Sequence, residues 1–140
     1  MQSIEEHNLI VARLFTDEDL VESLREICRK HEVTAAIIIS VIGQLKQFTL
    51  GYFDGRKYLY DDFPEVHELL SVAGMVSRSR EDDEYQFHLH AVVGNKEKQT
   101  FGGHLTKGLV QHTSEIALLK THIKVKRKME ETGLLGLYLE

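Results

Sequence analysis

The sequence predicts an α+β domain built on a largely antiparallel sheet, or a partly open barrel, with one main flanking helix. One segment near the N-terminus has apolar residues at helical spacing, whereas most of the remaining chain forms short runs typical of strands, bounded by turn residues. This order of one strand, one helix and then many strands favours an α+β fold. The 140 residues include one proline and no linker or repeat, so we expect a single domain over residues 1–140.

The first elements follow from residues 7–30. Residues 7–14 predict a strand, and Thr16 is expected to cap a helix whose first acids, at positions 17–19, lie at the positive end of the helix dipole. An apolar stripe at helical spacing then predicts a helix that runs to about Lys30 and packs on the sheet; it consists of Leu20, Leu24, Ile27 and Cys28.

Strands are expected through most of the remaining chain. Residues 34–42 are β-branched and almost wholly apolar, which predicts a central strand buried on both faces and ended by Gly43. Residues 45–53 lead into the turn Asp54-Gly55, a strong hairpin signal. Further strands are predicted over residues 57–60, 68–76, 84–93, 99–106 and 113–119.

Three histidines form the most informative pattern in the chain. His88 and His90 alternate on one face of a predicted strand, because successive side chains point to opposite faces. A hairpin turn over residues 94–98 would return the chain so that His104 lies beside them. This requires a register in which paired residue numbers add up to an even number, and a loop of about three or five residues.

The same register provides an apolar face for the core. It would place five apolar side chains opposite the histidines, namely Phe87, Leu89, Ala91, Phe101 and Leu105. A β-bulge at Gly102-Gly103 would shift the register by one residue. A histidine pair on a strand also occurs by chance in a chain with eight histidines, so a satisfied polar pair is the alternative to a metal site. Zinc is the first choice of metal, because it accepts neutral imidazoles, while copper, nickel or iron also suit these ligands.

Composition limits the other functions. The formal net charge of −5 opposes a whole-surface attraction to nucleic acid, and one basic cluster, at Lys120 and residues 124–128, is expected to be mainly solvated. The lone Cys28 is expected to be a buried apolar residue and predicts no internal disulfide. No apolar run is long enough to span a bilayer, so we expect a cytoplasmic protein without membrane contact.

An ordered set of motifs resembles the PPC domain, the plants-and-prokaryotes conserved domain, from about Ile4 to Leu139. The motifs are residues 51–54 (GYFD), 68–74 (ELLSVAG), 88–90 (HLH), 102–105 (GGHL) and 113–115 (TSE). The resemblance implies an antiparallel sheet with a flanking helix, a homotrimer, and a metal site at His88, His90 and His104. It also implies DNA association, although the AT-hook to which plant members owe DNA contact has no counterpart here.

Three other polar residues have a possible role. Glu68 could be a partner of the metal ligands, a fourth ligand or a general base, or equally a surface glutamate. Thr113 and Glu115 share one face of the last predicted strand and could line a pocket or a subunit contact, or be solvated. His67 and His112 lack ligand spacing and are not assigned to the site.

Three classes of function remain open. The first is a binding or regulatory module, associated with DNA or a transcription-regulator partner. The second is a zinc-dependent metalloenzyme of the hydrolase type, since three histidines leave an open coordination position, although the chain shows no nucleophile motif or phosphate loop. The third is a small-ligand-binding protein with a structural metal. The first class is preferred.

Overall fold

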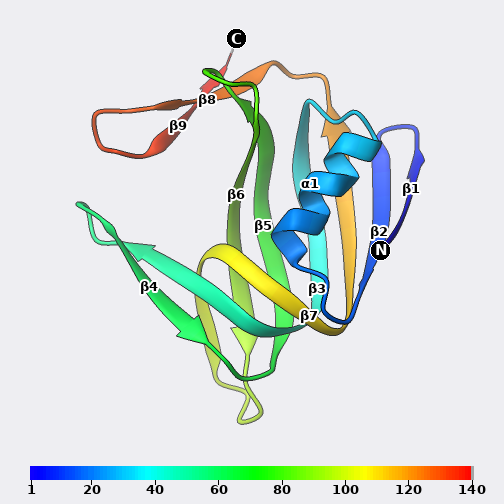
Figure 1. Ribbon diagram of the computed structural model, residues 1–140, viewed down its shortest axis with the longest axis vertical. Coiled ribbons are helices and arrows are strands. Elements are labelled where there is room, and N and C mark those ends of the chain that lie inside the picture. Colours follow the sequence, from blue (N-terminus) through cyan, green and yellow to red (C-terminus); the bar gives the residue numbers. More distant parts are fainter. Residues whose placement is uncertain (140) are drawn as a thin grey trace.

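The computed structural model describes residues 1–139, which form one helix and nine strands (Figure 1). The elements in chain order are β1 (Gln2–Glu6), β2 (Leu9–Phe15), α1 (Leu20–Lys30), β3 (Ala35–Phe53), β4 (Tyr58–Phe63), β5 (His67–Ser79), β6 (Tyr85–Gly94), β7 (Thr100–Thr121), β8 (Val125–Met129) and β9 (Leu135–Leu139). The predicted fold class is confirmed. All strand pairs are antiparallel except β5 with β8.

The sheet curves until part of it forms a ring. Strands β3, β5, β6 and β7 pair in a cycle, since β6 pairs with both β5 and β7 while β3 also pairs with both. The β1–β2 hairpin extends the sheet from β7, and the β8–β9 hairpin extends it from β5. Figure 1 shows the β4 and β8–β9 segments projecting on the same side of the molecule.

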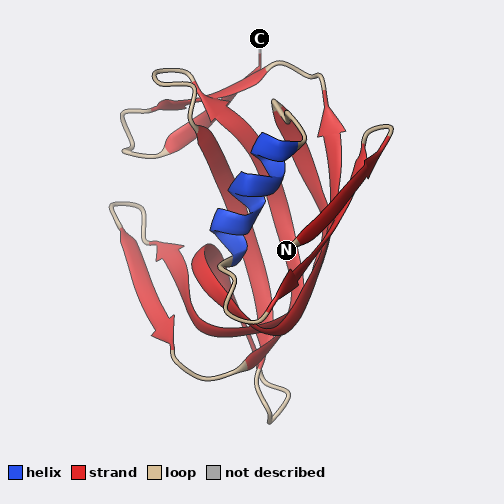
Figure 2. Cartoon of the chain, turned by 45° about the vertical axis from the view of Figure 1, so that its right-hand side comes forward, coloured by secondary structure: helices blue, strands red, loops and turns tan. Residues whose placement is uncertain are grey.

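The core lies between the concave face of the sheet and α1, which covers that face (Figure 2). The helix buries the predicted stripe completely, because Leu20, Leu24, Ile27 and Cys28 have no exposed surface. Burial raises the pKa of the Cys28 thiol to about 12, so this cysteine is an inert core residue, as predicted.

The predicted start of the helix was wrong by one turn. Asp19 is the N-cap, and its Oδ1 accepts hydrogen bonds from the amides of Val21 and Glu22. Thr16 instead donates its hydroxyl to the carbonyl of Gln111 on β7. Asp17 between them has a left-handed backbone (φ 70°), which turns the chain before the helix begins.

Two predicted strand ends were also wrong. Gly43 lies within β3, and a Cβ there would meet the Thr113 carbonyl oxygen at 2.3 Å. The glycine therefore permits close approach of β7. The segments predicted at 99–106 and 113–119 join into the single strand β7. Register shifts between β3 and β7 let both long strands bend without breaking.

The expectation that residues 34–42 are buried on both faces is wrong for the single chain. Ala36, Ile38 and Val41 are buried, but Ile37, Ile39 and Ile42 are 40–54% exposed on the convex face. The apolar composition of β3 exceeds what one chain buries, so this face is available for a partner.

The histidine hairpin has the predicted register. Strands β6 and β7 are joined by residues 95–99, and His90 pairs directly with His104. No register shift occurs at Gly102 or Gly103, so the alternative with a bulge there is wrong. Leu89, Ala91 and Leu105 are buried as expected, Phe87 packs against the core, and Phe101 is 39% exposed.

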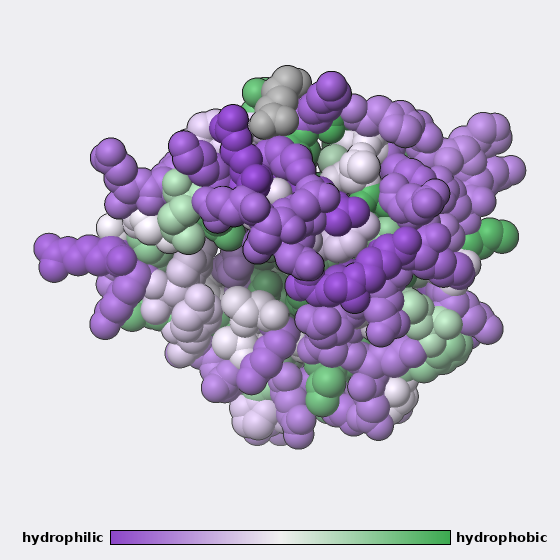
Figure 3. Space-filling model, turned by 45° about the horizontal axis from the view of Figure 1, so that its top comes forward, coloured by the Kyte–Doolittle hydropathy of each residue, from purple (hydrophilic) through white to green (hydrophobic). Residues whose placement is uncertain are grey.

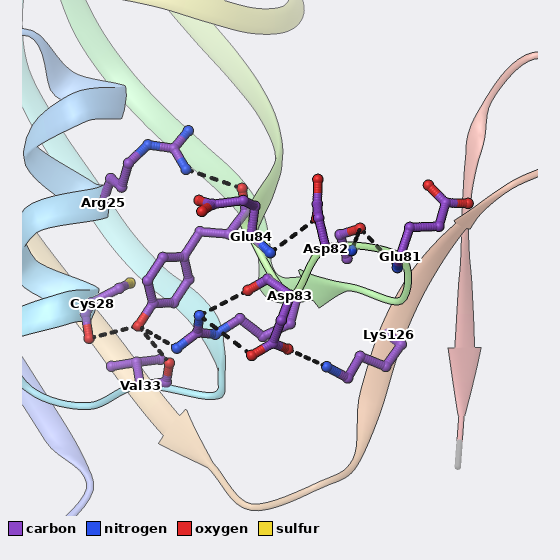
Figure 4. Close-up of polar contacts among 11 residues, drawn as sticks. Arg25, Cys28, Val33, Glu81, Asp82, Asp83, Glu84 and Lys126 are labelled. Carbon is purple, nitrogen blue, oxygen red and sulfur yellow. Dashed lines mark hydrogen bonds and ion pairs between the residues drawn. The ribbon is translucent and has the colours of Figure 1, made fainter.

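The C-terminal hairpin and β1 were not predicted. The parallel pairing of β8 with the end of β5 places Arg127 beside Ser79, and the amide of Arg80 donates to the Arg127 carbonyl. Lys126 on β8 forms an ion pair with Asp83 in the turn between β5 and β6 (Figure 4). These contacts fix β8 against the end of β5 and the turn that precedes β6.

A second set of polar contacts joins α1 and the segment after it to Tyr85, the first residue of β6. The hydroxyl of Tyr85 lies within hydrogen-bonding distance of the carbonyls of Cys28 and Val33, at 3.0 and 2.9 Å. Arg25 donates to the Tyr85 carbonyl at 3.1 Å (Figure 4). The helix and the segment after it therefore fix the beginning of β6, next to the turn that Lys126 of β8 contacts.

The surface is predominantly hydrophilic on the face shown in Figure 3, where hydrophobic residues form small separate areas. Within residues 1–139 no helix has the length and apolarity required to cross a bilayer.

Candidate metal centre

Three imidazole rings from two adjacent strands converge at one point. The ring centroids of His88, His90 and His104 are 5.0–5.7 Å apart, and one nitrogen of each ring lies within 4.8 Å of the others. The hairpin causes this convergence, because strand alternation puts His88 and His90 on one face and the direct pairing with His90 brings His104 onto that face.

Neighbouring groups favour neutral imidazoles. Desolvation, with smaller contributions from the charges of His88, His90 and Arg127, lowers the pKa of His104 to about 4. The pKa of His88 is also lowered, first by desolvation and then by Arg127 and His90. Neutral imidazole is the form that binds metal ions, so these two rings are ready to act as ligands at neutral pH.

The donor set fits a divalent transition metal. At Zn–N distances of roughly 2.0–2.1 Å, tetrahedral ligand atoms lie roughly 3.3 Å apart. Small side-chain rotations would bring the three nitrogens to that spacing from their present 4.8 Å limit. The Nδ1 atom of His104 is buried and has no hydrogen-bond partner among the described residues, and a cation bound there would satisfy it.

A pocket of about 350 Å³ opens beside this three-histidine group. It lies between β6, β7, the β4 strand and the β8–β9 hairpin. Its lining contains His88, His104, Tyr58 and Arg127, together with Gln86, Phe87, Met129, Gly133, Leu134 and Leu135. The ring of Tyr58 lies 5.2 Å from that of His104, centroid to centroid. A small molecule in this pocket could therefore reach the histidines.

Glu68 does not lie with the histidines. It is exposed on β5, where its carboxylate accepts a hydrogen bond from Gln44, and it is five residues along the strand from Ala73, the partner of His90. At roughly 3.3 Å per residue this separation is roughly 16 Å. The structure therefore gives no support to Glu68 as a ligand or base at this centre.

Thr113 and Glu115 line a different pocket, of about 420 Å³, together with Glu68 and His112. Thr113 also accepts a hydrogen bond from Arg13. His67 is buried and packs edge-on against Phe48 and Phe63, which agrees with its exclusion from the metal site.

Sequence reasoning missed Arg127 and Tyr58. The cluster at residues 124–128 was predicted to be mainly solvated, yet Arg127 is only 7% exposed. The alternation of buried Val125 and Arg127 with more exposed Lys126 and Lys128 is a strand signal that the run of positive charge concealed. Tyr58 could have been noticed from its place at the start of the strand that returns from the Asp54-Gly55 hairpin turn.

The fold and the site together define a one-helix α+β domain that carries a three-histidine group at a β-hairpin. The family model of the Plants and Prokaryotes Conserved (PCC) domain matches residues 1–122, and the chain belongs to this family. The resemblance inferred from the motifs is therefore confirmed.

Solved structures that are similar to this chain agree with the family assignment. A plant- and prokaryote-conserved (PPC) protein from Pyrococcus horikoshii is 30% identical, with a TM-score of 0.82 over 96% of this chain and 91% of that one. A metal-containing protein from Archaeoglobus fulgidus is 29% identical, with a TM-score of 0.83 over 97% and 96%. A candidate DNA-binding protein from Bacteroides thetaiotaomicron shares the fold at 21% identity and a TM-score of 0.88, over 99% and 96%.

A curated relative is much longer. The bifunctional protein GlmU of Synechococcus sp. is 32% identical over 91% of this chain, which corresponds to 20% of GlmU. The chain thus spans about a fifth of the length of the curated relatives it matches.

Proposed function

We propose that this chain is a homotrimeric binding or regulatory module that holds one divalent metal ion per subunit at His88, His90 and His104. The convergence of three nitrogens within 4.8 Å carries the proposal. Zinc is the first choice, because neutral imidazoles suit it and three protein ligands leave a fourth position open. The metal-containing protein from Archaeoglobus fulgidus, at 29% identity, supports the presence of a metal.

Elemental analysis of the purified protein tests the metal site. We expect about one metal equivalent per chain, and a loss of most of it in His104→Ala. His112→Ala is the matched control, because His112 is an exposed histidine on the same strand that lines the other pocket. Equal metal content in the two variants, or none in the natural protein, would contradict the proposal.

The convex face of the sheet is the observation that supports the proposed trimer. Neighbouring strands β2, β7, β3 and β5 expose apolar side chains there: Leu9, Val11, Leu119, Ile37, Ile39, Ile42 and Leu70. Apolar surface gathered in this way is typical of subunit contacts. Sedimentation equilibrium measures the assembly directly, and a monomer at micromolar concentration would contradict it.

DNA association is the weaker part of the proposal. The net charge is −5, and several members of the one basic cluster are already engaged. Lys120 pairs with Glu5, Lys126 pairs with Asp83, and Arg127 is buried. A DNA role would therefore depend on the remaining lysines of this cluster, Lys124 and Lys128, or on a protein partner. A polarisation titration with labelled duplex DNA at several salt concentrations tests direct contact, since phosphate binding weakens steeply with salt.

A zinc-dependent hydrolase is the second candidate, favoured by the pocket beside the open coordination position. A bound zinc ion would supply Lewis acidity and a lowered water pKa. The residues of this chain would hold it, orient a bound molecule against Tyr58 and exclude water with the β8–β9 hairpin. No aspartate or glutamate lines this pocket among residues 1–139, so no carboxylate is placed there to act as a general base. This absence favours a binding role. A cytoplasmic location stays a prediction.

A further inference from the structure

The pocket beside the three histidines contains one positive side chain that no acidic group neutralises. Arg127 is 7% exposed, and no ion pair of the described residues includes it. A buried charge without a partner is costly, and a ligand of opposite charge would offset that cost.

The hydrogen bonds of Arg127 are incomplete. Nη1 donates to the Leu135 carbonyl at 2.8 Å, which ties β8 to β9. Nη2 lies 3.4 Å from Nδ1 of His88, at the long limit of hydrogen bonding, and Nε is buried without a partner. A guanidinium has five N–H donors in a fork that suits a carboxylate, so most of its donor capacity is unused.

The charge balance of the pocket points to an anion. Among the described residues the lining holds Arg127 and two of the three histidines but no aspartate or glutamate. A divalent metal on the histidines would raise the local positive charge further. An anionic ligand between the metal and Arg127 would compensate both charges and contact the open coordination position.

The other lining residues indicate which anion. Phe87, Met129, Leu134 and Leu135 provide apolar walls, and Tyr58 adds an aromatic ring beside His104. Phosphate or sulfate would leave these walls unused, whereas a carboxylate with a small apolar body would bury that body against them. A volume of about 350 Å³ accommodates a ligand the size of benzoate.

We propose that this pocket binds a small apolar monocarboxylate, whose carboxylate is held by Arg127 next to the metal and whose body packs between Tyr58 and the β8–β9 hairpin. This deepens the proposed function and rests on it. A small apolar monocarboxylate would then be the ligand to which the proposed metal-bearing regulatory module responds.

Benzoate titration by calorimetry tests the inference on zinc-loaded protein of measured metal content. We expect benzoate to bind the natural protein, and benzamide, which has the same shape but no charge, to bind at least tenfold more weakly. Arg127→Met should weaken benzoate binding at least tenfold while leaving metal content unchanged. Lys128→Met, at the exposed neighbouring position, is the matched control and should bind benzoate like the natural protein.

Two further measurements keep the outcome decisive. Arg127→Lys keeps the charge without the fork, so it should fold if Arg127→Met does not, and should still weaken benzoate binding. Equal binding of benzoate and benzamide, or no benzoate binding by metal-containing protein, would overturn the inference and leave the metal site standing. Protein without metal that binds benzoate through Arg127 would overturn the metal site and support the carboxylate pocket.

Discussion

The chemistry of individual residues is decided by their neighbours in this protein. His104 and His67 are both histidines on strands, yet one converges with two other imidazoles and the other packs between phenylalanine rings. Arg127 and Lys128 are adjacent basic residues, yet one is buried in the pocket and the other is exposed. Different strands separate the two histidines, whereas strand alternation separates Arg127 from Lys128, so that there a one-residue step changes the role of a side chain.

The lowered pKa of His104 makes stability depend on pH in the metal-free protein. The folded state binds a proton at His104 only near pH 4, whereas the unfolded chain binds it near the ordinary value of 6.5. The free energy of unfolding therefore falls as the pH drops from 6.5 to about 4. In His104→Gln the fall in the free energy of unfolding should be smaller than in the natural protein, by on the order of 1–2 kcal/mol. Urea denaturation with a chelator at pH 7 and pH 4.5 measures it, and equal falls in both proteins would contradict the assignment.

At the scale of elements, caps and close strand contacts set the geometry. Asp19 ends the loop before α1 and accepts two amide hydrogen bonds in the first turn, and its second oxygen accepts from the Gly108 amide on β7 at 3.2 Å. Gly74 on β5 allows β6 to come so close that a Cβ would meet the His88 carbonyl oxygen at 2.0 Å. The helix start and the position of His88 thus each depend on one residue.

We expect Asp19→Ala to destabilise the protein by about 1–2 kcal/mol, because the helix loses its N-cap and β7 loses a contact. Thr16→Ala, which removes a single hydrogen bond to Gln111, should cost less. Chemical denaturation of both variants checks the order. A larger loss for Thr16→Ala would restore the cap predicted from the sequence.

Gly74→Ala should displace β6 at His88, with a loss of about 1–3 kcal/mol in stability and weaker metal binding. Gly102→Ala is the control. It lies on β7 two residues from His104, and its added Cβ would make an ordinary contact of 3.4 Å with the Ala91 carbonyl oxygen. Metal titration and thermal melts compare the two. Metal affinity unchanged in Gly74→Ala would show that the close contact does not position His88.

At the scale of the whole molecule, the two faces of the sheet differ in how far they are buried. The concave face packs against α1 and forms the core. The convex face leaves apolar side chains exposed on four neighbouring strands, among them Ile37, Ile39 and Ile42 on β3. The single chain thus buries one face, and the proposed trimer would cover the other.

Ile39→Glu should weaken the proposed trimer strongly, since a charge buried at an apolar contact is costly. Ile39 is 54% exposed in the single chain, so the monomer should still fold. Leu59→Glu, at a position 46% exposed on β4 and outside this group, is the control. Sedimentation equilibrium compares the two variants. A trimer unaffected by Ile39→Glu would place the interface elsewhere.

The local pattern of the chain was sufficient for the fold class, the helix and the histidine register. Helical spacing of four apolar residues located α1, although not its N-cap. The alternation of His88 and His90, with a hairpin of suitable length, predicted that His104 joins them, and the structure excluded the alternative with a bulge at Gly102-Gly103. These features depend on neighbours along the chain or across one turn, so the spacing of the residues in the sequence is enough to predict them.

Only the tertiary structure decided the rest. Gly43 continues a strand because β7 approaches it closely, and Arg127 enters the pocket because β8 pairs with β5, far away in sequence. Glu68 is separated from the histidines for the same reason, since its distance from them depends on the register between β5 and β6. Contacts between segments distant along the chain depend on packing in three dimensions, which no local pattern of residues encodes.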